Sequence, residues 1–357
     1  MIMNRTIKVA VGLSGGVDSA VAAALLQEQG YEVTGVFLLC YRGPGCRTDE
    51  DRKEALDVAL KLEIPFEVLD FRKEYQEKVL EYFKAEYEAG RTPNPDVVCN
   101  REIKFGLFYE WVLKKEFDYV ATGHYACVRS TQDTRFELLI PKEKRKDQTY
   151  FLYQLREEQL RHILFPIGGM TKDEVRHKAK ELKLPVAKKP DSQGICFVGE
   201  VGVKQFLQRM GVKEKRGEVA NVSGKVVGEH KGVWFYTIGQ RHGFEVKNVS
   251  PQTKPLYIFK KDLKKNILVV GTREACMRRE FEVGEVYLRH ETRSTIQDLS
   301  NVKVRIRHGG QLILAKIVIR DSRLMVQLAK PVFGVAPGQS VVFYNREICL
   351  GGGVISA

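Results

Sequence analysis

The fold of this chain is set by Ile7–Gly30, whose sequence reads IKVAVGLSGGVDSAVAAALLQEQG. The first part, Ile7–Leu13, is short, apolar and rich in β-branched residues, which predicts a buried strand. The alanine-rich part that ends at Gly30 predicts a helix closed by a glycine. Between them lies the hexapeptide Ser14–Ser19, SGGVDS. A strand, a glycine turn and a helix N-terminus predict an anion site, because backbone N–H groups converge there and the helix dipole adds positive charge.

Phosphate is the expected guest of this loop, although the loop is not of the Walker A type. A Walker A loop places a lysine directly after its glycines, and no lysine follows Gly15 and Gly16. The alternative is that the two glycines form a plain tight turn. The flanking elements and the two serines, Ser14 and Ser19, favour the phosphate-binding interpretation.

The composition sets broad limits on the class of protein. The chain has 357 residues, which suits two or three domains, and a formal net charge of +13. This charge favours a polyanionic partner such as RNA, DNA or an acidic membrane, with a charge-rich enzyme as the alternative. No apolar stretch is long enough to span a bilayer, and Met1–Thr6 leaves no room for a signal peptide before the first strand. We therefore expect a cytoplasmic protein.

Seven cysteines are scattered along the chain, without a Cys-x-x-Cys pair or a zinc-type Cys/His spacing. An odd number of cysteines argues against a disulfide scaffold. We expect no metal site, some thiols buried as apolar residues, and one or two reactive thiols.

The N-terminal part alternates strands and helices, which predicts a doubly wound α/β domain with a parallel sheet and helices on both faces. Ligands of such sheets bind beyond the carboxyl ends of the strands, where Ser14–Ser19 falls. Thr48 and Thr171 each begin a capping-box sequence, and the second opens a lysine-rich helix. Further strands are expected at Val33–Leu39, Pro65–Phe71, Asp118–Val128 and Phe136–Ile140, and helices at Thr48–Leu62, Arg72–Ala89, Asn100–Lys115 and Thr171–Leu182.

After about Val198, short β-like segments separated by turns replace this alternation. We expect a small β-rich middle domain followed by a C-terminal β-barrel, with domains at residues 1–198, 199–278 and 279–357. The expected strands lie at Val226–Val227, Val233–Ile238, Leu256–Phe259, Ile267–Val270, Val302–Ile306, Leu312–Ile319, Leu324–Leu328 and Ser340–Tyr344.

The segment Asn94–Phe105, NPDVVCNREIKF, combines a helix start with two reactive groups. Asn94 can cap a helix whose first residue is Pro95. Asp96 and Cys99 then share a face, and the positive helix end favours the Cys99 thiolate. The alternative is that Asp96 only completes a cap and that Cys99 is a small core residue.

A second cysteine, Cys196, lies in the turn-rich segment Lys189–Phe197, where a thiol is accessible to a sulfur donor or a partner thiol. From the spacing alone, an incidental cysteine is the alternative. His124 follows a strand at the sheet edge that carries the phosphate loop, and it either contacts phosphate or base or is a structural histidine. Lys146–Gln148 suits polar nucleotide contacts or an ordinary solvated turn. The basic segments Tyr236–Gly243 and Arg305–His308 suit RNA contacts or solvated strand faces.

Taken together, these segments resemble the tRNA-specific 2-thiouridylases, which thiolate the wobble uridine of certain tRNAs. The phosphate loop alone is shared by several families of ATP pyrophosphatases, whereas the pairing of Asn-Pro-Asp-x-x-Cys with Gly-Ile-Cys-Phe is far more specific. The matching segments occur in the order of the family, at Gly12–Ser19, Thr92–Asn100, Ala121–Tyr125, Lys146–Gln148, Ser192–Phe197 and Tyr236–Arg241.

The resemblance implies how ATP is bound and used. Adenine lies near Leu38, Gly123 closes that pocket, and Mg²⁺ neutralises the phosphates. The uridine C2 oxygen attacks the α-phosphate, which gives an adenylated base and pyrophosphate. The phosphates contact Gly12, Leu13, Ser14, Gly15, Gly16, Val17, Asp18 and Ser19.

The resemblance also implies a route for sulfur. Cys196 carries a persulfide received from a cysteine desulfurase or a relay protein, and its terminal sulfur reaches C2 of the uridine. Cys99 attacks or resolves the persulfide, which leaves a Cys99–Cys196 disulfide to be reduced in each cycle. Asp96 assists proton transfer, and its place at a helix N-terminus predicts a lowered pKa.

The same resemblance implies contacts with tRNA. The target base leaves its stack and meets Asn94, Pro95 and Asp96. Other tRNA contacts are expected from His124, Lys146, Asp147, Gln148, Arg307, His308 and Gln339.

Leu39–Arg47 does not match the family. Cys40 and Cys46 in this segment are either incidental thiols or metal ligands, and we favour incidental thiols.

One alternative mechanism has Asp96, Cys99 and Cys196 hold an iron–sulfur cluster. A rival activity is that of another adenylating enzyme with this loop, such as an amidotransferase-type synthetase or a tRNA lysidine synthetase. A rival from another class is an RNA-binding protein with a vestigial nucleotide site, against which the intact loop argues.

Overall fold

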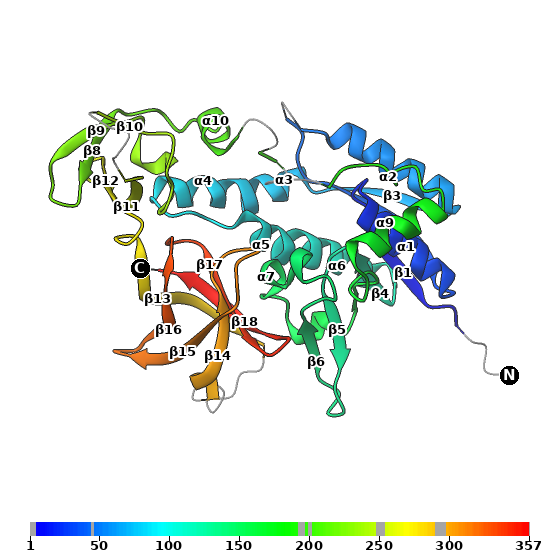
Figure 1. Ribbon diagram of the computed structural model, residues 1–357. Coiled ribbons are helices and arrows are strands. Elements are labelled where there is room, and N and C mark those ends of the chain that lie inside the picture. The colour runs from blue at the N-terminus through cyan, green and yellow to red at the C-terminus, as the bar shows by residue number, and fades with distance from the viewer. Residues whose placement is uncertain are drawn as a thin grey trace. The chain divides into compact units, whose positions relative to one another are not determined.

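The computed structural model describes residues 5–43, 46–191, 197–198, 202–247, 254–289 and 298–356 (Figure 1). These residues form two compact units. Unit 1 comprises Met1–Val79, Asp96–Glu200 and Asn345–Leu350, and unit 2 comprises Leu80–Pro95, Val201–Tyr344 and Gly351–Ala357.

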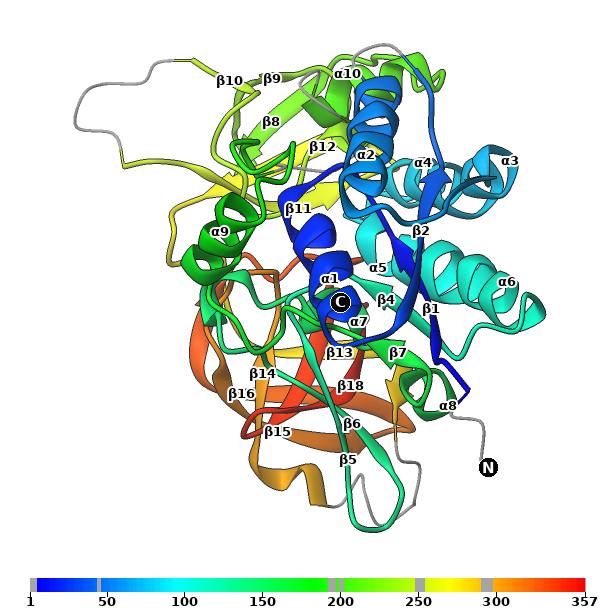
Figure 2. The ribbon, with the colours of Figure 1, turned by 90° about the vertical axis from the view of Figure 1, so that its right-hand side faces the viewer.

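Unit 1 is built on a parallel sheet, as the sequence predicts. Its strand order is β3-β2-β1-β4-β7, and every neighbouring pair is parallel (Figure 2). Val9 at the centre of β1 pairs with Val33 of β2 and with Tyr119 of β4. The strands are β1 (Lys8–Gly12), β2 (Glu32–Leu39), β3 (Phe66–Asp70), β4 (Tyr119–Thr122) and β7 (Ile163–Leu164).

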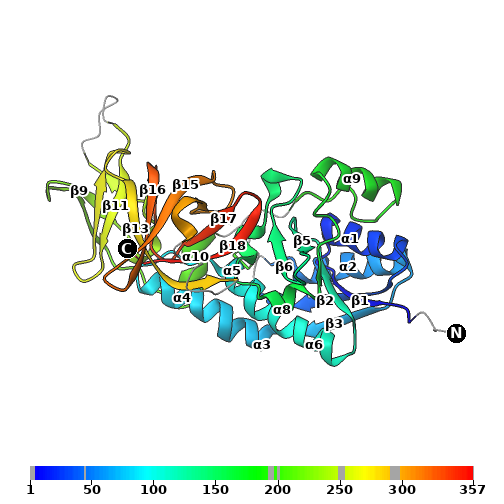
Figure 3. The same ribbon diagram turned by 90° about the horizontal axis from the view of Figure 1, so that it is seen from below.

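Helices cover both faces of this sheet (Figure 3). On one side lie α1 (Val17–Glu28), α2 (Thr48–Leu62) and α9 (Lys172–Glu181), and on the other lies α6 (Phe108–Lys114). The alanines of α1 are fully buried in a core shared with α2 and α9. Small side chains let these helices approach closely, which explains the alanine-rich sequence that predicted α1.

The chain between β3 and β4 is helical, with two π-helical interruptions that the sequence does not predict. It begins with α3 (Arg72–Tyr75) and continues through a π-helical segment, Gln76–Leu80, into α4 (Glu81–Glu88). A second run joins α5 (Pro95–Cys99) to α6 through the π-helical segment Asn100–Leu107. π-helical turns are frequent at functional sites, and this second segment directly follows Cys99.

Three local predictions are wrong. The strand expected at Asp118–Val128 ends at Thr122, because the chain turns at Gly123 and His124 and enters a hairpin of β5 (Cys127–Ser130) and β6 (Phe136–Leu139). Thr48 does not cap α2, because its hydroxyl donates to the Tyr41 carbonyl. The strand expected at Val233–Ile238 is instead a 3-10 turn at Val233–Phe235. The capping box at Thr171 is confirmed.

Short elements complete unit 1. α7 (Thr149–Leu152) and α8 (Glu157–Leu160) follow the β5–β6 hairpin. Ile348 and Cys349 of the last described strand pair with Leu139 and Leu138 of β6.

Unit 2 contains the two β-rich parts predicted from the sequence. The first is a sheet with the strand order β10-β9-β8-β12-β11, preceded by α10 (Gly202–Arg209). Its strands are β8 (Gly217–Asn221), β9 (Val226–His230), β10 (Glu245–Val246), β11 (Tyr257–Asp262) and β12 (Ile267–Gly271).

The second part is a β-barrel with the strand order β13-β16-β15-β14-β17-β18, closed by the pairing of β18 with β13. Alternate side chains fill its interior, as in other small barrels. The strands are β13 (Met277–Leu288), β14 (Val302–Arg305), β15 (Ile313–Arg320), β16 (Arg323–Phe333), β17 (Ser340–Asn345) and β18 (Ile348–Ile355). Across the described ranges, no helix combines the length and apolarity needed to cross a membrane.

Candidate functional site

The loop between β1 and α1 has the geometry of an anion site. Gly16 is the N-cap of α1, and no side chain caps the helix, so the first-turn N–H groups face the loop without a side-chain acceptor. Ser14 and Ser19 brace the loop. The Ser19 hydroxyl accepts from the Ser14 N–H at 3.2 Å and donates to the Gly16 carbonyl at 3.1 Å. These residues therefore fit a phosphate group.

Two glycines allow neighbouring backbone segments to pack closely against this loop. Gly15 has a φ of +72°, and a Cβ there would collide with the Asp51 carbonyl. A Cβ on Gly123 would lie 2.5 Å from the Ser19 backbone nitrogen, directly in front of a first-turn amide. Gly123 thus lies beside the loop, at the sheet edge where the sequence places it. Leu38 is partly buried near the carboxyl end of β2, at the same edge.

A lysine from a distant helix supplies the positive charge that the loop sequence lacks. Lys172, the first residue of α9, places its Nζ 2.7 Å from Oδ1 of Asp18 and 2.9 Å from Oδ1 of Asp191. The Tyr125 hydroxyl donates to the same Asp18 oxygen at 3.1 Å. The Lys172 side chain is only 12% exposed. The sequence analysis missed Lys172, although it predicted the helix that carries it.

Asp191 is the centre of a cluster of cations. Lys146 lies 2.6 Å from its Oδ2, and Arg176 lies 2.6 Å from its Oδ1. Burial opposes ionisation of Asp191, but hydrogen bonds from Lys146 and Lys172 outweigh it and hold the pKa of this carboxyl well below its usual range. The segment that follows Asp191, with the predicted sulfur carrier Cys196, lies outside the described residues.

Lys146, Asp147 and Gln148, which were expected to contact tRNA, form a braced turn. Asp147 is buried and accepts from the N–H of Thr149 at 2.9 Å. The Gln148 side chain accepts from the Tyr125 N–H at 2.8 Å. The Lys146 side chain is 42% exposed, and its contact with tRNA stays a prediction.

The helix predicted to carry the chemistry exists, and it begins at Pro95. Asn94 is 7% exposed and Cys99 is 8% exposed. The expectation of a lowered pKa for Asp96 is wrong. Burial raises the pKa of this carboxyl above 3.8, although nearby Lys104 acts in the opposite direction. Desolvation is the larger of these two effects and decides the direction.

His124 lies in a buried pocket between two aromatic rings, Phe105 and Phe165. Its Nδ1 is 2.8 Å from the Thr122 hydroxyl, and its Nε2 is 3.4 Å from Nζ of Lys104. Burial and then the charge of Lys104 lower the pKa of His124 well below 6.5, so the ring is neutral at physiological pH. Its predicted contact with tRNA is not tested by this geometry.

The remaining predicted contacts lie in unit 2. Arg307 and His308 are exposed in the turn after β14. Gln339 precedes β17, and its side-chain nitrogen donates to the carbonyls of Thr92 and Pro93 at 2.9 and 3.1 Å.

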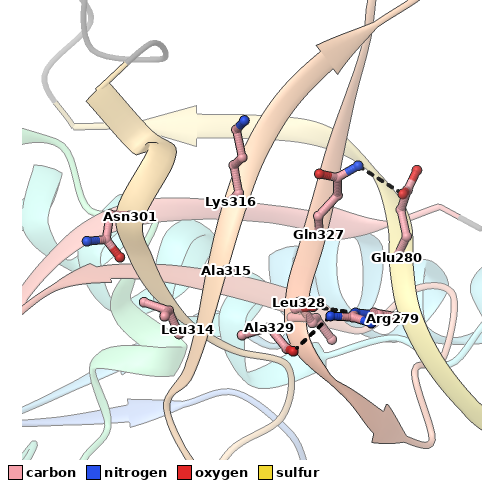
Figure 4. Close-up of a pocket in the computed structure, with 9 residues that line it drawn as sticks. All are labelled: Arg279, Glu280, Asn301, Leu314, Ala315, Lys316, Gln327, Leu328 and Ala329. Carbon is pink, nitrogen blue, oxygen red and sulfur yellow. Dashed lines mark hydrogen bonds between the residues drawn. The ribbon is translucent and has the colours of Figure 1, made fainter.

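Two other features do not form part of this site. Among the residues that the structure describes, no cluster of three His, Cys, Asp or Glu side chains could hold a metal ion, and Cys40 and Cys46 belong to none. A shallow hollow of about 420 Å³ lies on the barrel wall, where the Arg279 guanidinium donates to the carbonyls of Leu328 and Ala329 (Figure 4). None of the predicted site residues lines it.

Three family models match consecutive parts of the chain. Residues 7–200 match the tRNA methyl transferase HUP domain, residues 204–272 match the tRNA methyl transferase PRC-barrel domain, and residues 278–355 match the aminomethyltransferase beta-barrel domain.

Relatives are similar over almost the whole chain. The protein named tRNA-specific 2-thiouridylase MnmA from Streptococcus pyogenes serotype M1 is 42% identical over 99% of this chain and 96% of its own length. The protein of the same name from Streptococcus uberis is also 42% identical, with the same coverage of both chains. Among solved structures, the U34-tRNA thiolase NcsA from Methanococcus maripaludis is 20% identical, with a TM-score of 0.36 over 57% of this chain and 64% of its own.

Proposed function

This chain belongs to the tRNA-specific 2-thiouridylase family, and from that premise we propose that it catalyses ATP-dependent 2-thiolation of the wobble uridine of tRNA. The 42% identity over 99% of the chain carries the proposal. The uncapped start of α1, the close approach of Gly123 to it and the lysine beside Asp18 supply what an adenylating enzyme needs.

The first half-reaction is adenylation. Gly12–Ser19 binds the phosphates of ATP, and Leu38 and Gly123 line the adenine site. The positive charge of Lys172 stabilises the leaving pyrophosphate. The C2 oxygen of the uridine attacks the α-phosphorus, and the bond between the α-phosphorus and the bridging oxygen breaks. Mg²⁺, when bound, neutralises charge on the phosphates. Asp18 is suited to this ion, because carboxylates and phosphate oxygens are its preferred ligands.

The second half-reaction is sulfur transfer. The terminal sulfur of a persulfide on Cys196 bonds to C2, and AMP leaves with the former C2 oxygen. The Cys99 thiolate then attacks Sγ of Cys196, and the bond between this Sγ and the transferred sulfur breaks. The resulting Cys99–Cys196 disulfide is reduced with two electrons by a thiol reductant. Burial raises the pKa of Asp96, which makes this carboxyl a better proton donor to the base than an exposed carboxyl.

The partners follow from this chemistry. A positively charged chain binds tRNA, and the target base leaves its stack to reach Asn94, Pro95 and Asp96. A cysteine desulfurase or a relay protein supplies the persulfide. A cytoplasmic location fits both partners. The other tRNA contacts in this proposal are His124, Lys146, Asp147, Gln148, Arg307, His308 and Gln339.

Mass spectrometry of tRNA after incubation with ATP, Mg²⁺ and a persulfide donor tests this proposal. We expect exchange of one oxygen for sulfur at the wobble uridine, loss of the exchange in Cys99→Ala and Cys196→Ala, and no loss in the control Cys46→Ala. Pyrophosphate release without sulfur in the tRNA would indicate another adenylating enzyme. Stoichiometric iron in the purified protein, with thiolation by free sulfide, would replace the persulfide route by the iron–sulfur route.

A further inference from the structure

The position of α5 depends on the residues that precede it. This helix has five residues and carries both Asp96 and Cys99. At its C-terminal end α5 continues into the π-helical segment Asn100–Leu107, whereas its N-terminal end depends on what holds the chain before it. Thr92 and Pro93, which lead into the helix through Asn94, are therefore the place to look for what holds it.

The barrel holds this segment through Gln339. A glutamine amide has two N–H donors, and in Gln339 one donates to the Thr92 carbonyl at 2.9 Å and the other to the Pro93 carbonyl at 3.1 Å. The Thr92 N–H donates in turn to the Pro337 carbonyl at 2.8 Å. A Cβ on Gly338 would lie 2.8 Å from the Thr92 nitrogen, so the two backbones approach as closely as a glycine allows.

The middle domain holds the same segment through Thr237, whose hydroxyl oxygen is 3.1 Å from that of Thr92. The loop around Thr237 is rigidly built. The Thr237 N–H donates to the Gln240 side chain at 3.0 Å, and Nζ of Lys261 donates to the Tyr236 carbonyl at 2.6 Å. This is the Tyr236–Arg241 motif, to which the proposed reaction assigns no task.

We propose that Gln339 and Thr237 are positioning residues, which hold the backbone of Thr92–Pro93 and thereby set the start of α5. The inference rests on the proposed function. By this inference the two β-rich parts have a function besides tRNA binding, because each holds the segment Thr92–Pro93 that precedes the helix with Asp96 and Cys99. Both amide protons of Gln339 serve this purpose, which leaves only its carbonyl oxygen for a contact with tRNA.

The test separates the reaction rate from tRNA affinity. In the full-length protein, Gln339→Met removes both donors at similar side-chain length, and Thr237→Val removes the hydroxyl at similar shape. We expect each variant to lower the single-turnover rate of pyrophosphate release at saturating tRNA about ten- to hundredfold, the scale of a small misplacement of reacting groups. The dissociation constant for tRNA should not change in Thr237→Val, because Thr237 is not among the proposed tRNA contacts. In Gln339→Met the dissociation constant reports the contact of the lost carbonyl oxygen with tRNA, separately from the rate at saturation.

Two controls complete the experiment. Thr237→Ser keeps the hydroxyl and should keep the wild-type rate. Gln132→Ala alters an exposed glutamine in the turn between β5 and β6 and should change neither quantity. Weaker tRNA binding with an unchanged rate at saturation would make Gln339 a tRNA contact only and would overturn the inference, as would a wild-type rate in both Gln339→Met and Thr237→Val.

Hydrogen exchange gives a readout that does not depend on activity. Peptides that cover Thr92–Cys99 should exchange faster in Gln339→Met than in the wild type or Gln132→Ala, with peptides from the β1–α1 region unchanged. Equal exchange at Thr92–Cys99 would refute the inference. A wild-type protein that releases no pyrophosphate with any tRNA would instead refute the proposed function, and the exchange measurement would still decide the role of Gln339.

Discussion

At the scale of single residues, the partners of a side chain decide its chemistry. Lys172 is nearly buried between Asp18 and Asp191, so its charge is already desolvated beside the phosphate loop. The sequence could not reveal this, because Lys172 and Asp18 are 154 positions apart and periodicity reports only on neighbours. The expected pKa of Asp96 was wrong for a related reason, since burial is a property of the fold.

Lys172→Met should weaken the first half-reaction. Loss of a charge-assisted contact corresponds to about 1.5–3 kcal/mol, or roughly ten- to hundredfold in the rate of tRNA-dependent pyrophosphate release. Lys180→Met, an exposed position on the same helix, is the matched control. Equal rates in the two variants would show that Lys172 has no part in handling phosphate.

Asp96→Asn should stabilise the protein near neutral pH and abolish thiolation. Because the pKa of Asp96 is raised in the folded state, the unfolded chain ionises first as the pH rises above 3.8, and the folded state loses stability over that range. Below 3.8 both states are protonated, and the advantage of the variant should vanish. Thermal unfolding across this pH range checks the prediction against Asp133→Asn, an exposed control. A destabilised Asp96→Asn at neutral pH would contradict it.

At the scale of elements, the sequence predicted most strands and helices, because their signals are local. Residue patterns located β1, α1, β2, α2, β3 and α9 within a few residues. The π-helical segments were missed, because segments of 5 and 8 residues are too short for their longer turn to change the apolar pattern of the surrounding helix. The early end of β4 was missed because the turn at Gly123 is fixed by its approach to the backbone of Ser19, which only the fold reveals.

Gly123→Ala should disturb the start of α1. Its Cβ would lie 2.5 Å from the Ser19 nitrogen, and overpacking of this kind costs about 1–3 kcal/mol of unfolding free energy. ATP affinity should fall as well, because the methyl group stands before a first-turn amide. Gly169→Ala is the matched control, since nothing lies within 4 Å of the added carbon. Calorimetry and ATP titration measure both effects, and similar behaviour of the two variants would refute the role of Gly123.

At the scale of the whole molecule, the order of a parallel α/β part, a β-rich part and a barrel could be predicted from composition and turn spacing. The meeting of Cys99 with Cys196 stays a prediction, because Cys196 lies outside the described residues. The net charge of +13 predicts electrostatic binding of a polyanion, and this contribution does not depend on base-specific contacts.

The affinity for tRNA should therefore fall steeply as the salt concentration rises. Arg307 is exposed, and Arg307→Ala should lower the slope of log affinity against log salt by about one phosphate contact. Arg320→Ala is the control, because Glu280 already compensates that charge at 2.9 Å. Binding titrations over a salt series give both slopes, and an unchanged slope in Arg307→Ala would remove this residue from the interface.

The strand β18 serves both units. Its residues Ile348 and Cys349 pair with β6 of unit 1, whereas Gly351–Ile355 pairs with β13 of unit 2. β18 follows all the other described strands in the chain, so the edge of β6 stays uncovered and the barrel stays open until β18 has been synthesised. An unpaired edge is a template for aggregation. A nascent chain stalled before β18 would thus expose two unpaired strand edges at once, one on β6 and one on β13.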